Sequence, residues 1–414
     1  MAAARARAVI GGRSALSMPP MAILFLIVFI DLVGFGLVIP LLPFYGEAFQ
    51  AAPSTVTLLL ASYSFAQFLM APVWGRLSDR YGRKPILLVS LGFSIASYLW
   101  LANADALWML FAARLLSGAG AGNITAAQAY IADVTPRERR AKGMGVIGAA
   151  FGLGFTIGPA IGGYIAGEHP GIAELARPAF GAAGLSALAF ALTLARLPES
   201  LPPEARSGIV RTGRLVLARA AFKRPALRQL ILLLFVTVAA FAGMESTFAL
   251  WAERAFGWGP KTVGYTFFYV GLVLAVMQGG LVGKLVERFG EARLVTAGAG
   301  IIALGLIAVP FSISVPLVLA AMAFLAIGMG LLNPSINGLL SLHAAADEQG
   351  GILGVAQSGS SLARIVGPAV AGQFFDALGR NAPYYLSAAL MVGVTLLALR
   401  IPRARPAMQA GPAS

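Results

Sequence analysis

The sequence predicts an all-α integral membrane protein whose twelve transmembrane helices form two pseudo-symmetric bundles of six. Three observations support this fold class. The 414-residue chain is 58% hydrophobic and 12% charged, whereas soluble domains carry roughly 25% charged residues. Long apolar runs follow one another along the chain, and two sequence patterns return about 208 residues later. A chain this apolar needs the lipid bilayer as its solvent.

The apolar runs predict helices rather than strands. A helix crosses the ~30 Å core of a bilayer with ~20 apolar residues, whereas a membrane barrel strand alternates over only ~10 residues. The runs in this chain are long and continuously apolar. The twelve predicted spans are 21–44, 55–75, 86–103, 107–132, 143–167, 178–196, 228–252, 262–283, 293–312, 316–342, 351–376 and 382–400.

Loop charges orient the predicted spans. With the N-terminus in the cytoplasm, 25 of the 31 Lys and Arg residues lie on the cytoplasmic side and four lie outside, as the positive-inside rule requires. Both termini are therefore expected in the cytoplasm, and the bacterial inner membrane is the expected location. The same bias accounts for the net charge of +14 without a nucleic-acid partner.

The spans and loops divide the chain into five predicted segments. A cytoplasmic arm and a first six-helix bundle are followed by a basic linker, a second six-helix bundle and a cytoplasmic tail. The linker is expected to carry a short surface helix near 209–222. The five segments are 1–20, 21–196, 197–227, 228–400 and 401–414.

The composition offers little for enzyme chemistry. The chain has no cysteine, which excludes disulfides and thiol catalysis. Its two histidines, His169 and His343, fall in predicted loops, and no Walker phosphate-binding loop occurs. We therefore expect neither an enzyme nor a cofactor or metal centre, and transport would draw its energy from an ion gradient.

Two repeated patterns support two copies of one unit. Gly75-Arg76-Leu77-Ser78-Asp79-Arg80-Tyr81-Gly82-Arg83-Lys84 forms a charged turn that returns as Gly283-Lys284-Leu285-Val286-Glu287-Arg288-Phe289-Gly290. Gly158-Pro159-Ala160-Ile161-Gly162-Gly163 in the fifth span returns as Gly367-Pro368-Ala369-Val370-Ala371-Gly372 in the eleventh. Parallel halves with a binding site at the bilayer midplane are one arrangement of secondary transporters.

These motifs resemble those of the major facilitator superfamily and, within it, the twelve-helix drug–proton antiporters. The segment 75–84 is similar to the superfamily's signature loop between helices two and three, and 154–163 is similar to the glycine-proline motif of the antiporter branch. The segment Asp31-Leu32-Val33-Gly34-Phe35-Gly36-Leu37-Val38-Ile39-Pro40-Leu41-Leu42-Pro43 is similar to the first helix of tetracycline exporters. The resemblance implies a monomeric, proton-coupled antiporter that exports lipophilic or amphiphilic small molecules such as antibiotics by alternating access.

The chain departs from the tetracycline exporters at three positions. That group carries an acid in helix three, a histidine in helix eight and an acid in helix nine, and the corresponding residues here are Ser97, Leu274 and Ile302. These groups are linked with drug and proton handling in the exporters. Their replacement puts tetracycline itself in doubt as the substrate, but it leaves the export of a lipophilic compound as the expectation.

The signature segment is expected to act as a cytoplasmic gate. Asp79 would pair with Arg83 and cap the start of the third helix, near Asp133 at the end of the fourth. Such a cluster would clamp the two halves, and the alternative is a simple topology anchor. The second copy has Glu291 where the first has Arg83, so the first copy is expected to form the stronger latch. The predicted gate residues are Gly75, Asp79, Arg80, Gly82, Arg83 and Asp133.

The glycine-proline motif predicts a bent fifth helix. Gly154, Gly158 and Gly162 fall on one helical face, where small residues let helices approach closely, and Pro159 bends the helix. Packing of this helix, with Gly163, against the eighth would seal the pathway against proton leak. Ordinary helix packing is the alternative.

Four charges lie inside predicted spans: Asp31, Arg114, Glu245 and Arg364. An intramembrane charge is costly and usually faces a partner or a water-filled cavity. Burial raises the pKa of a carboxyl group and a nearby arginine lowers it, so Glu245 is the first candidate for the proton carrier and Asp31 the second. Arg114 opens a sequence similar to the family's helix-four motif, which implies a proton-coupling role. The alternative is fixed ion pairs, such as Asp31 with Arg114 or Glu245 with Arg364.

Uncharged polar residues inside the spans complete the predicted substrate cavity, which also includes the four intramembrane charges. They are Gln67, Asn123, Gln128, Gln278, Asn333, Asn337 and Gln357. Hydrogen bonds between helices are the alternative role. Aromatic candidates for an apolar lining are Phe35, Tyr63, Phe151, Phe241, Trp251, Phe268 and Tyr269.

Two other functions compete with drug export. A symporter or exporter of a small anionic metabolite or a sugar would use Arg114 and Arg364 to hold the substrate. A membrane sensor or scaffold without transport activity is the third possibility, and the intact repeated motifs argue against it.

Overall fold

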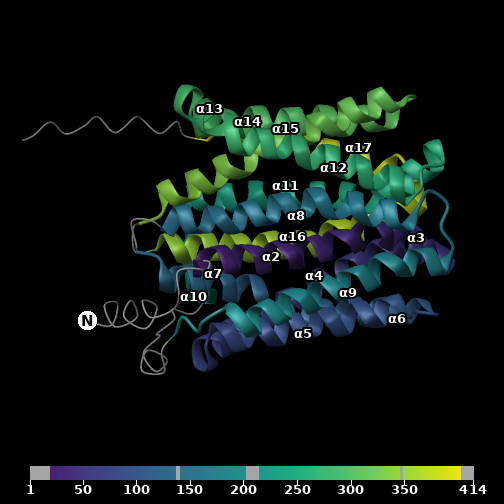
Figure 1. Ribbon diagram of the computed structural model, residues 1–414. Helices are drawn as coiled ribbons and strands as arrows, with labels where there is room; N and C mark the ends of the chain where they lie inside the picture. The colour runs from purple at the N-terminus through teal and green to yellow at the C-terminus, as the bar shows by residue number, and fades with distance from the viewer. Residues whose placement is uncertain (1–18, 137–139, 202–213, 346–347, 402–414) are drawn as a thin grey trace, which may run out of the picture.

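The computed structural model describes residues 19–136, 140–201, 214–345 and 348–401, and within these ranges the chain forms helices and no strand. Helices are labelled as in Figure 1. The elements of the first half are α2 (Pro20–Val38), η1 (Ile39–Leu41), α3 (Leu42–Ala48), α4 (Pro53–Tyr81), α5 (Arg83–Ala102), α6 (Leu107–Ala119), α7 (Asn123–Val134), α8 (Arg140–Ala166) and α9 (Ile172–Arg196).

The second half follows a short linker helix, α10 (Arg214–Lys223), which confirms the surface helix expected in the basic linker; residues 202–213 lie outside the described ranges. The elements of the second half are α11 (Pro225–Phe256), α12 (Pro260–Val276), η4 (Met277–Leu281), α13 (Val282–Phe289), α14 (Glu291–Ala308), η5 (Val309–Phe311), α15 (Val315–His343), α16 (Gln349–Leu378) and α17 (Ala382–Ala398).

The helices lie side by side along one common direction (Figure 1). Within the first half α2 packs on α8 and α9, and within the second half α11 packs on α16 and α17. Two pairs make the most extensive contacts between the halves: α8 with α12, and α4 with α16. These two pairs correspond to each other under the sequence repeat, so the interface has the same pseudo-symmetry as the chain.

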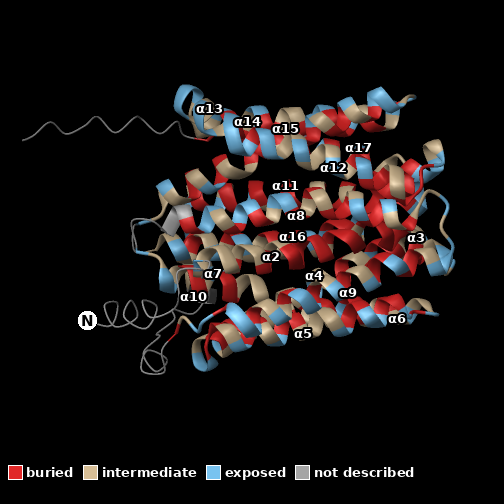
Figure 2. Cartoon of the chain, viewed as in Figure 1, coloured by how far each residue is buried: buried red, intermediate tan, exposed pale blue. Residues whose placement is uncertain are grey.

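The membrane character of the fold is confirmed. Nine helices among the described residues are long and apolar enough to cross a bilayer, and the count of twelve spans stays a prediction. Figure 2 shows buried residues gathered along α11 and α16, whereas α13 at the rim has none. Large apolar side chains are exposed on the outer helices, including Leu304 (60%) and Leu396 (59%), as expected where the protein meets lipid.

The fourth predicted span is not continuous, because glycines break it between α6 and α7. A Cβ at Gly120 would overlap the side chain of Phe93, and one at Gly122 would lie 2.8 Å from the Trp74 ring. The Trp74 indole Nε1 donates a hydrogen bond of 2.6 Å to the carbonyl of Ala119, which satisfies a carbonyl at the break. The break places residue 123 at the start of a new helix.

Two other spans are irregular. The first is interrupted by the 3₁₀ segment η1, which contains Pro40. The eighth contains a π-helical segment, η4, that was not predicted and that includes Gln278. Such π-helical turns are rare and frequently lie at functional sites.

The charged turn is shorter than the sequence suggested. The helix α4 continues through Tyr81, and only Gly82 leaves the helical conformation, with φ of 107°. Gly290 takes the same place in the second copy, with φ of 78°. Positive φ values of this kind favour glycine, which explains why both copies have glycine at this position.

We call the end of the molecule where α2 begins the near end, and the end where α3 stops the far end. Helices alternate between them, so α4 begins at the far end and stops at the near end. In Figure 1 the near end lies on the left and the far end on the right.

Candidate functional site

Asp31 is the centre of a buried polar cluster in the first half. Its side chain lies in α2 and only 6% of the residue is exposed. Its Oδ2 accepts a hydrogen bond from Nδ2 of Asn123, and its Oδ1 accepts one of 3.5 Å from Oγ of Ser186 in α9. The break before α7 presents Asn123 to this carboxyl group. Asp31 is therefore held by two neutral donors from two other helices.

Arg114 in α6 is held by aromatic rings. It is 3% exposed, and its guanidinium carbon lies 4.6 Å from the ring centre of Tyr63 and 5.5 Å from that of Phe35. Its buried Nε has no hydrogen-bond partner among the described residues. No ion pair within 4.0 Å joins Arg114 to Asp31 in the described part of the chain, so the fixed pair considered as an alternative is not found.

The charges of the second half approach the same region. Glu245 in α11 is half-buried and Arg364 in α16 is exposed. The field of Arg364 acts on Glu245, although the two described side chains form no ion pair within 4.0 Å. The ring of Tyr63 in α4 contacts the Arg114 guanidinium, and the field of Arg364 also reaches its phenol.

Most uncharged polar candidates stay unpaired with other described residues. Asn333 is half-buried, Asn337 is exposed, and a weak hydrogen bond of 3.5 Å joins them along α15. The four glutamines make no side-chain hydrogen bond to another described residue. Gln67 is half-buried, and the exposed members are Gln128, Gln278 and Gln357. Of the seven, only Asn123 is brought to one of the four intramembrane charges.

Four of the seven aromatic candidates fall into two groups. Phe35 contacts both Tyr63 and Phe155, at ring-centre distances of 4.9 and 5.6 Å, and Phe155 stacks on Phe151. These rings come from α2, α4 and α8 and surround the Arg114 side of the cluster. Trp251 instead is 1% exposed and donates a hydrogen bond to Asn381, so it belongs to the core of the second half.

The signature segment forms an ion-pair cluster within the first half. Nη1 of Arg83 lies 2.6 Å from Oδ1 of Asp79, and its Nε lies 2.9 Å from Oδ2 of Asp133. The expected Asp79–Arg83 pair is confirmed. The expected cap is wrong: the backbone amides of Arg83 and Lys84 donate to the carboxylate of Glu199, at 2.9 and 3.1 Å.

Within the described ranges, Arg83 and Asp133 make no bond to the second half, so these two residues do not form the predicted clamp there. They bond to the first half and to the start of the linker, where Oγ of Ser200 donates to Asp133 over 2.9 Å. Gly75 and Gly82 are buried, and Arg80 is exposed and lies over its neighbour Tyr81. In the second copy Glu287 and Arg288 are exposed and form no ion pair with a described residue, as expected for the weaker copy.

The glycines of the fifth helix pack mainly on the first helix. A Cβ at Gly158 would lie 2.7 Å from Cα of Gly36, and one at Gly154 would lie 2.6 Å from Cβ of Leu32. Gly162 meets the carbonyl of Leu37 in the same way. The face with the spacing of four therefore contacts α2. The expected contact with the eighth helix exists, but other residues make it, notably Gly163 and the carbonyl of Pro159 against the start of α12.

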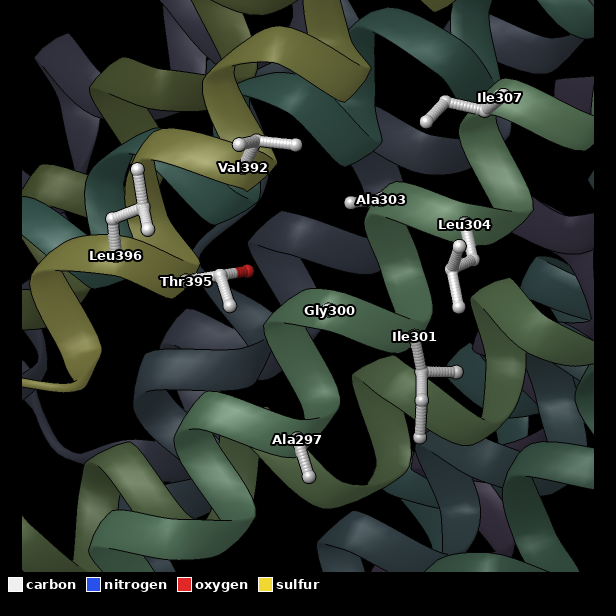
Figure 3. Close-up of a pocket in the computed structure, with 9 residues that line it drawn as sticks. All are labelled: Ala297, Gly300, Ile301, Ala303, Leu304, Ile307, Val392, Thr395 and Leu396. Carbon is white, nitrogen blue, oxygen red and sulfur yellow. The ribbon is translucent and has the colours of Figure 1, made fainter.

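A shallow pocket of about 480 Å³ lies elsewhere, between α14 and α17 (Figure 3). Its only polar side chain is Thr395, whose hydroxyl already donates to the carbonyl of Met391 over 2.8 Å. The pocket therefore offers an apolar contact surface and takes no part in the polar site. Its lining residues are Ala297, Gly300, Ile301, Ala303, Leu304, Ile307, Val392, Thr395 and Leu396.

The sequence matches the family model described as Major Facilitator Superfamily over residues 24–312 and 255–413. The chain belongs to the Major Facilitator Superfamily. It is 32% identical over 380 residues to the class C tetracycline resistance protein of Escherichia coli, covering 91% of this chain and 94% of that protein. It is 29% identical over 381 residues to multidrug resistance protein 2 of Bacillus subtilis (strain 168), covering 89% and 92%.

Solved superfamily structures share the fold. The human organic anion transporter MFSD10 (TETRAN) superposes with a TM-score of 0.70 and 25% identity, over 92% of this chain and all of that one. The nucleoside transporter NupG superposes with a TM-score of 0.74 at 14% identity, over 93% and 99%, which shows the fold alone. The protein is thus a multi-pass membrane protein of this superfamily.

The chain departs from the tetracycline exporters at Ser97, Leu274 and Ile302, and none of these described side chains forms a hydrogen bond with Asp31 or Arg114. Ser97 is 1% exposed and bonds to the carbonyl of Ser94. Ile302 is 1% exposed and packs against Gly328.

Sequence reasoning missed several functional candidates, including Ser186 and Glu199. Ser186 is one hydroxyl in an apolar helix and Glu199 lies in a linker, and neither position belongs to a motif. Two further acids, Glu168 and Asp376, each follow the repeated glycine-proline pattern by a few residues, and this shared position was the signal that could have found them.

Proposed function

We propose that the protein is a proton-coupled antiporter that exports lipophilic or amphiphilic small molecules from the cytoplasm by alternating access. The names of its relatives, tetracycline and multidrug resistance proteins, support drug-like compounds as the substrate class over a sugar or a small anionic metabolite. The excess of basic residues in alternate loops supports a cytoplasmic near end, with both termini in the cytoplasm of a bacterial cell. The protein would work as a monomer and without a cofactor.

The observation that carries the proposal is the environment of Asp31. A buried carboxylate that is locked to an arginine cannot take up a proton without leaving that arginine unpaired, which is costly in a low-dielectric interior. Asp31 is bonded instead to the neutral groups of Asn123 and Ser186. It can therefore gain and lose a proton while its partners stay satisfied, as a proton carrier must.

Arg114 and its rings supply the complementary part of the site. Cation–π contacts hold the guanidinium while its Nε keeps a free hydrogen-bond donor. The rings of Phe35 and Tyr63 offer flat apolar surface beside this donor, which suits an amphiphilic molecule with an aromatic body. Glu245 and Arg364 would complete the site from the second half.

Coupling would follow from competition at these charges. A proton that arrives from outside neutralises Asp31 or Glu245, weakens the polar contacts of the bound compound and favours its release. The proton then leaves to the cytoplasm in the conformation open to that side. At a membrane potential of 100 mV each proton supplies ~2.3 kcal/mol from the potential alone.

Transport by purified protein in liposomes tests the proposal. An imposed pH gradient should drive uptake of ethidium or another amphiphilic dye into inverted vesicles, and a proton uncoupler should abolish it. Asp31→Asn should remove proton-driven uptake while leaving downhill dye exchange, and Glu245→Gln provides the second variant. Asp105→Asn, which alters an exposed far-end acid, is the control. Full pH-driven transport by both Asp31→Asn and Glu245→Gln would refute the proton role, and transport of sugars or organic anions in place of dyes would refute the substrate class.

A further inference from the structure

The far end of the molecule is closed by carboxylates that cross from one half to the other. Glu168 follows α8 in the first half, and its carboxylate accepts two backbone hydrogen bonds from the second half. Its Oε1 lies 2.8 Å from the amide nitrogen of Gly259, and its Oε2 lies 3.1 Å from that of Thr262. These amides belong to the start of α12, so Glu168 caps a helix of the opposite half. The neighbouring carbonyl of Gly167 accepts a third bond from Lys261.

Asp376 makes the reciprocal contact. It lies near the far end of α16 in the second half, and its Oδ2 accepts a hydrogen bond of 3.1 Å from the amide of Ser54. Ser54 is in the first turn of α4, which belongs to the first half. Each half therefore sends one carboxylate to the first turn of a helix in the other half.

The two contacts are related by the internal repeat. Gly163 precedes Glu168 and Gly372 precedes Asp376, and these glycines are equivalent positions of the repeated pattern. A Cβ at Gly163 would lie 3.1 Å from Cα of Lys261, and one at Gly372 would lie 2.8 Å from Cα of Ser54. In each half a glycine lets the helix start approach, and the acid that follows binds its free amides.

The near end has no matching connection among the described residues. Within the described ranges, every hydrogen bond between the halves is at the far end. The ion pair between the halves in these ranges, Glu47 with Arg254 at 3.5 Å, is also at the far end. On α8 and on η4, glycines toward the near end have no described atom within 4 Å of an added Cβ. These positions are Gly145, Gly148, Gly279 and Gly280. Among the described residues, the polar contacts between the halves thus lie at the far end.

A carboxylate suits this position physically. The first amides of a helix have no partner within the helix, and the positive end of the helix dipole favours a negative group. Hydrogen bonds from backbone amides to a carboxylate are charge-assisted and stronger than neutral ones. When the halves separate at this end, both caps must be lost together.

We propose that Glu168 and Asp376 form a two-carboxylate far gate, which holds the far end closed and sets the equilibrium between the two access states of the transporter. They are positioning residues: they act on the relative placement of the halves and do not contact the compound carried. The inference rests on alternating access in the proposed function, with the far end as the outer face.

Distance measurements between spin labels test the far gate without any substrate. The chain has no cysteine, so labels can be placed at two introduced cysteines without background. Asp105→Cys and Ile313→Cys lie in exposed far-end loops of the two halves, and Tyr81→Cys and Phe289→Cys lie at exposed near-end positions. Pulsed electron–electron double resonance then measures the distance between the two labels at each end, and so reports the opening of that end, in lipid nanodiscs.

The variants are Glu168→Ala and Asp376→Ala, with Glu174→Ala as the matched control. Glu174 is also a far-end acid bonded to a backbone amide, that of Gly171 over 3.1 Å, but the contact stays within the first half. We expect each gate variant to raise the ratio of far-open to far-closed molecules at least about tenfold, and the double variant to raise it further. Tenfold corresponds to ~1.4 kcal/mol. The near-end distance should shorten in the same molecules.

Rescue separates a gate from a merely structural role. Glu168→Asp and Asp376→Glu keep the charge and should return the label distances toward those of the unmodified protein. The midpoint temperature of thermal unfolding is measured for every variant. Far-end distances in the double variant equal to those of Glu174→Ala would overturn the proposal. If no compound is transported but the distances shift as expected, then the proposed drug export is wrong while the far gate stands.

Discussion

Replacement of Gly158 by alanine tests the packing of the fifth helix on the first. A Cβ at this position would lie 2.7 Å from Cα of Gly36 and 2.8 Å from the carbonyl oxygen of Val33, both backbone atoms of α2. Carbon atoms in ordinary contact are ~3.5–4.0 Å apart, so α2 and α8 would have to separate by about 1 Å. A helix backbone cannot move aside as a side chain can.

Gly148→Ala supplies the matched comparison. Gly148 lies on the same helix, and an added Cβ meets no described atom within 4 Å. Alanine is favoured over glycine in a helix by ~1 kcal/mol, a gain that both variants share. Overpacking costs ~1–3 kcal/mol and applies only to Gly158→Ala. We therefore expect Gly158→Ala to be less stable than Gly148→Ala by about 1–3 kcal/mol.

Denaturant unfolding of the purified protein, followed by tryptophan fluorescence, measures this difference. Gly158→Ala should also lose proton-driven export, because α2 carries Asp31 and its displacement would separate Asp31 from Asn123 and Ser186. Equal unfolding midpoints for the two variants would refute the close packing of α8 on α2. A destabilised Gly158→Ala protein with normal export would refute the link from this packing to the site.

Three further predictions concern single side chains. Arg83→Ala removes the cation that pairs with Asp79 and Asp133 and should cost about 3–5 kcal/mol of unfolding free energy, whereas Arg288→Ala in the second copy should change it by less than about 0.5 kcal/mol; denaturant titration compares them. Trp74→Phe removes the donor at the break between α6 and α7 and should cost about 1–3 kcal/mol, whereas Trp108→Phe, at a position 63% exposed, should have little effect in the same titration. Asn123→Ala should lower proton-driven dye transport about tenfold or more, because a hydrogen bond to a charged group is worth ~1.5–3 kcal/mol; vesicle assays with unchanged transport would contradict the role of the Asp31 cluster.

Much of the fold followed from local sequence properties. Apolar length predicts where helices cross the bilayer, and the repeats at Gly75 and Gly283 predict two related halves. The limits of local reasoning appear where a helix changes course: the break between α6 and α7 depends on Phe93 and Trp74, which lie in other helices. A continuous apolar pattern gives no sign of such a contact.

The site was predicted less completely than the fold. The sequence by itself predicted which charges lie inside membrane spans, because an acid or arginine inside an apolar run is visible without any structure. It also identified Asn123 as a polar candidate, although not its partner.

The tertiary structure alone decided how these groups pair. It bonded Asp31 to Asn123 and Ser186, enclosed Arg114 in aromatic rings, assigned the helix cap to Glu199 and joined the halves through Glu168 and Asp376. The physical reason is that hydrogen bonds and ion pairs form between groups a few ångströms apart in space, and these partners are separated by many residues in the chain. The length of an apolar run depends on one segment of the chain, whereas a hydrogen bond or ion pair depends on how two distant segments are placed.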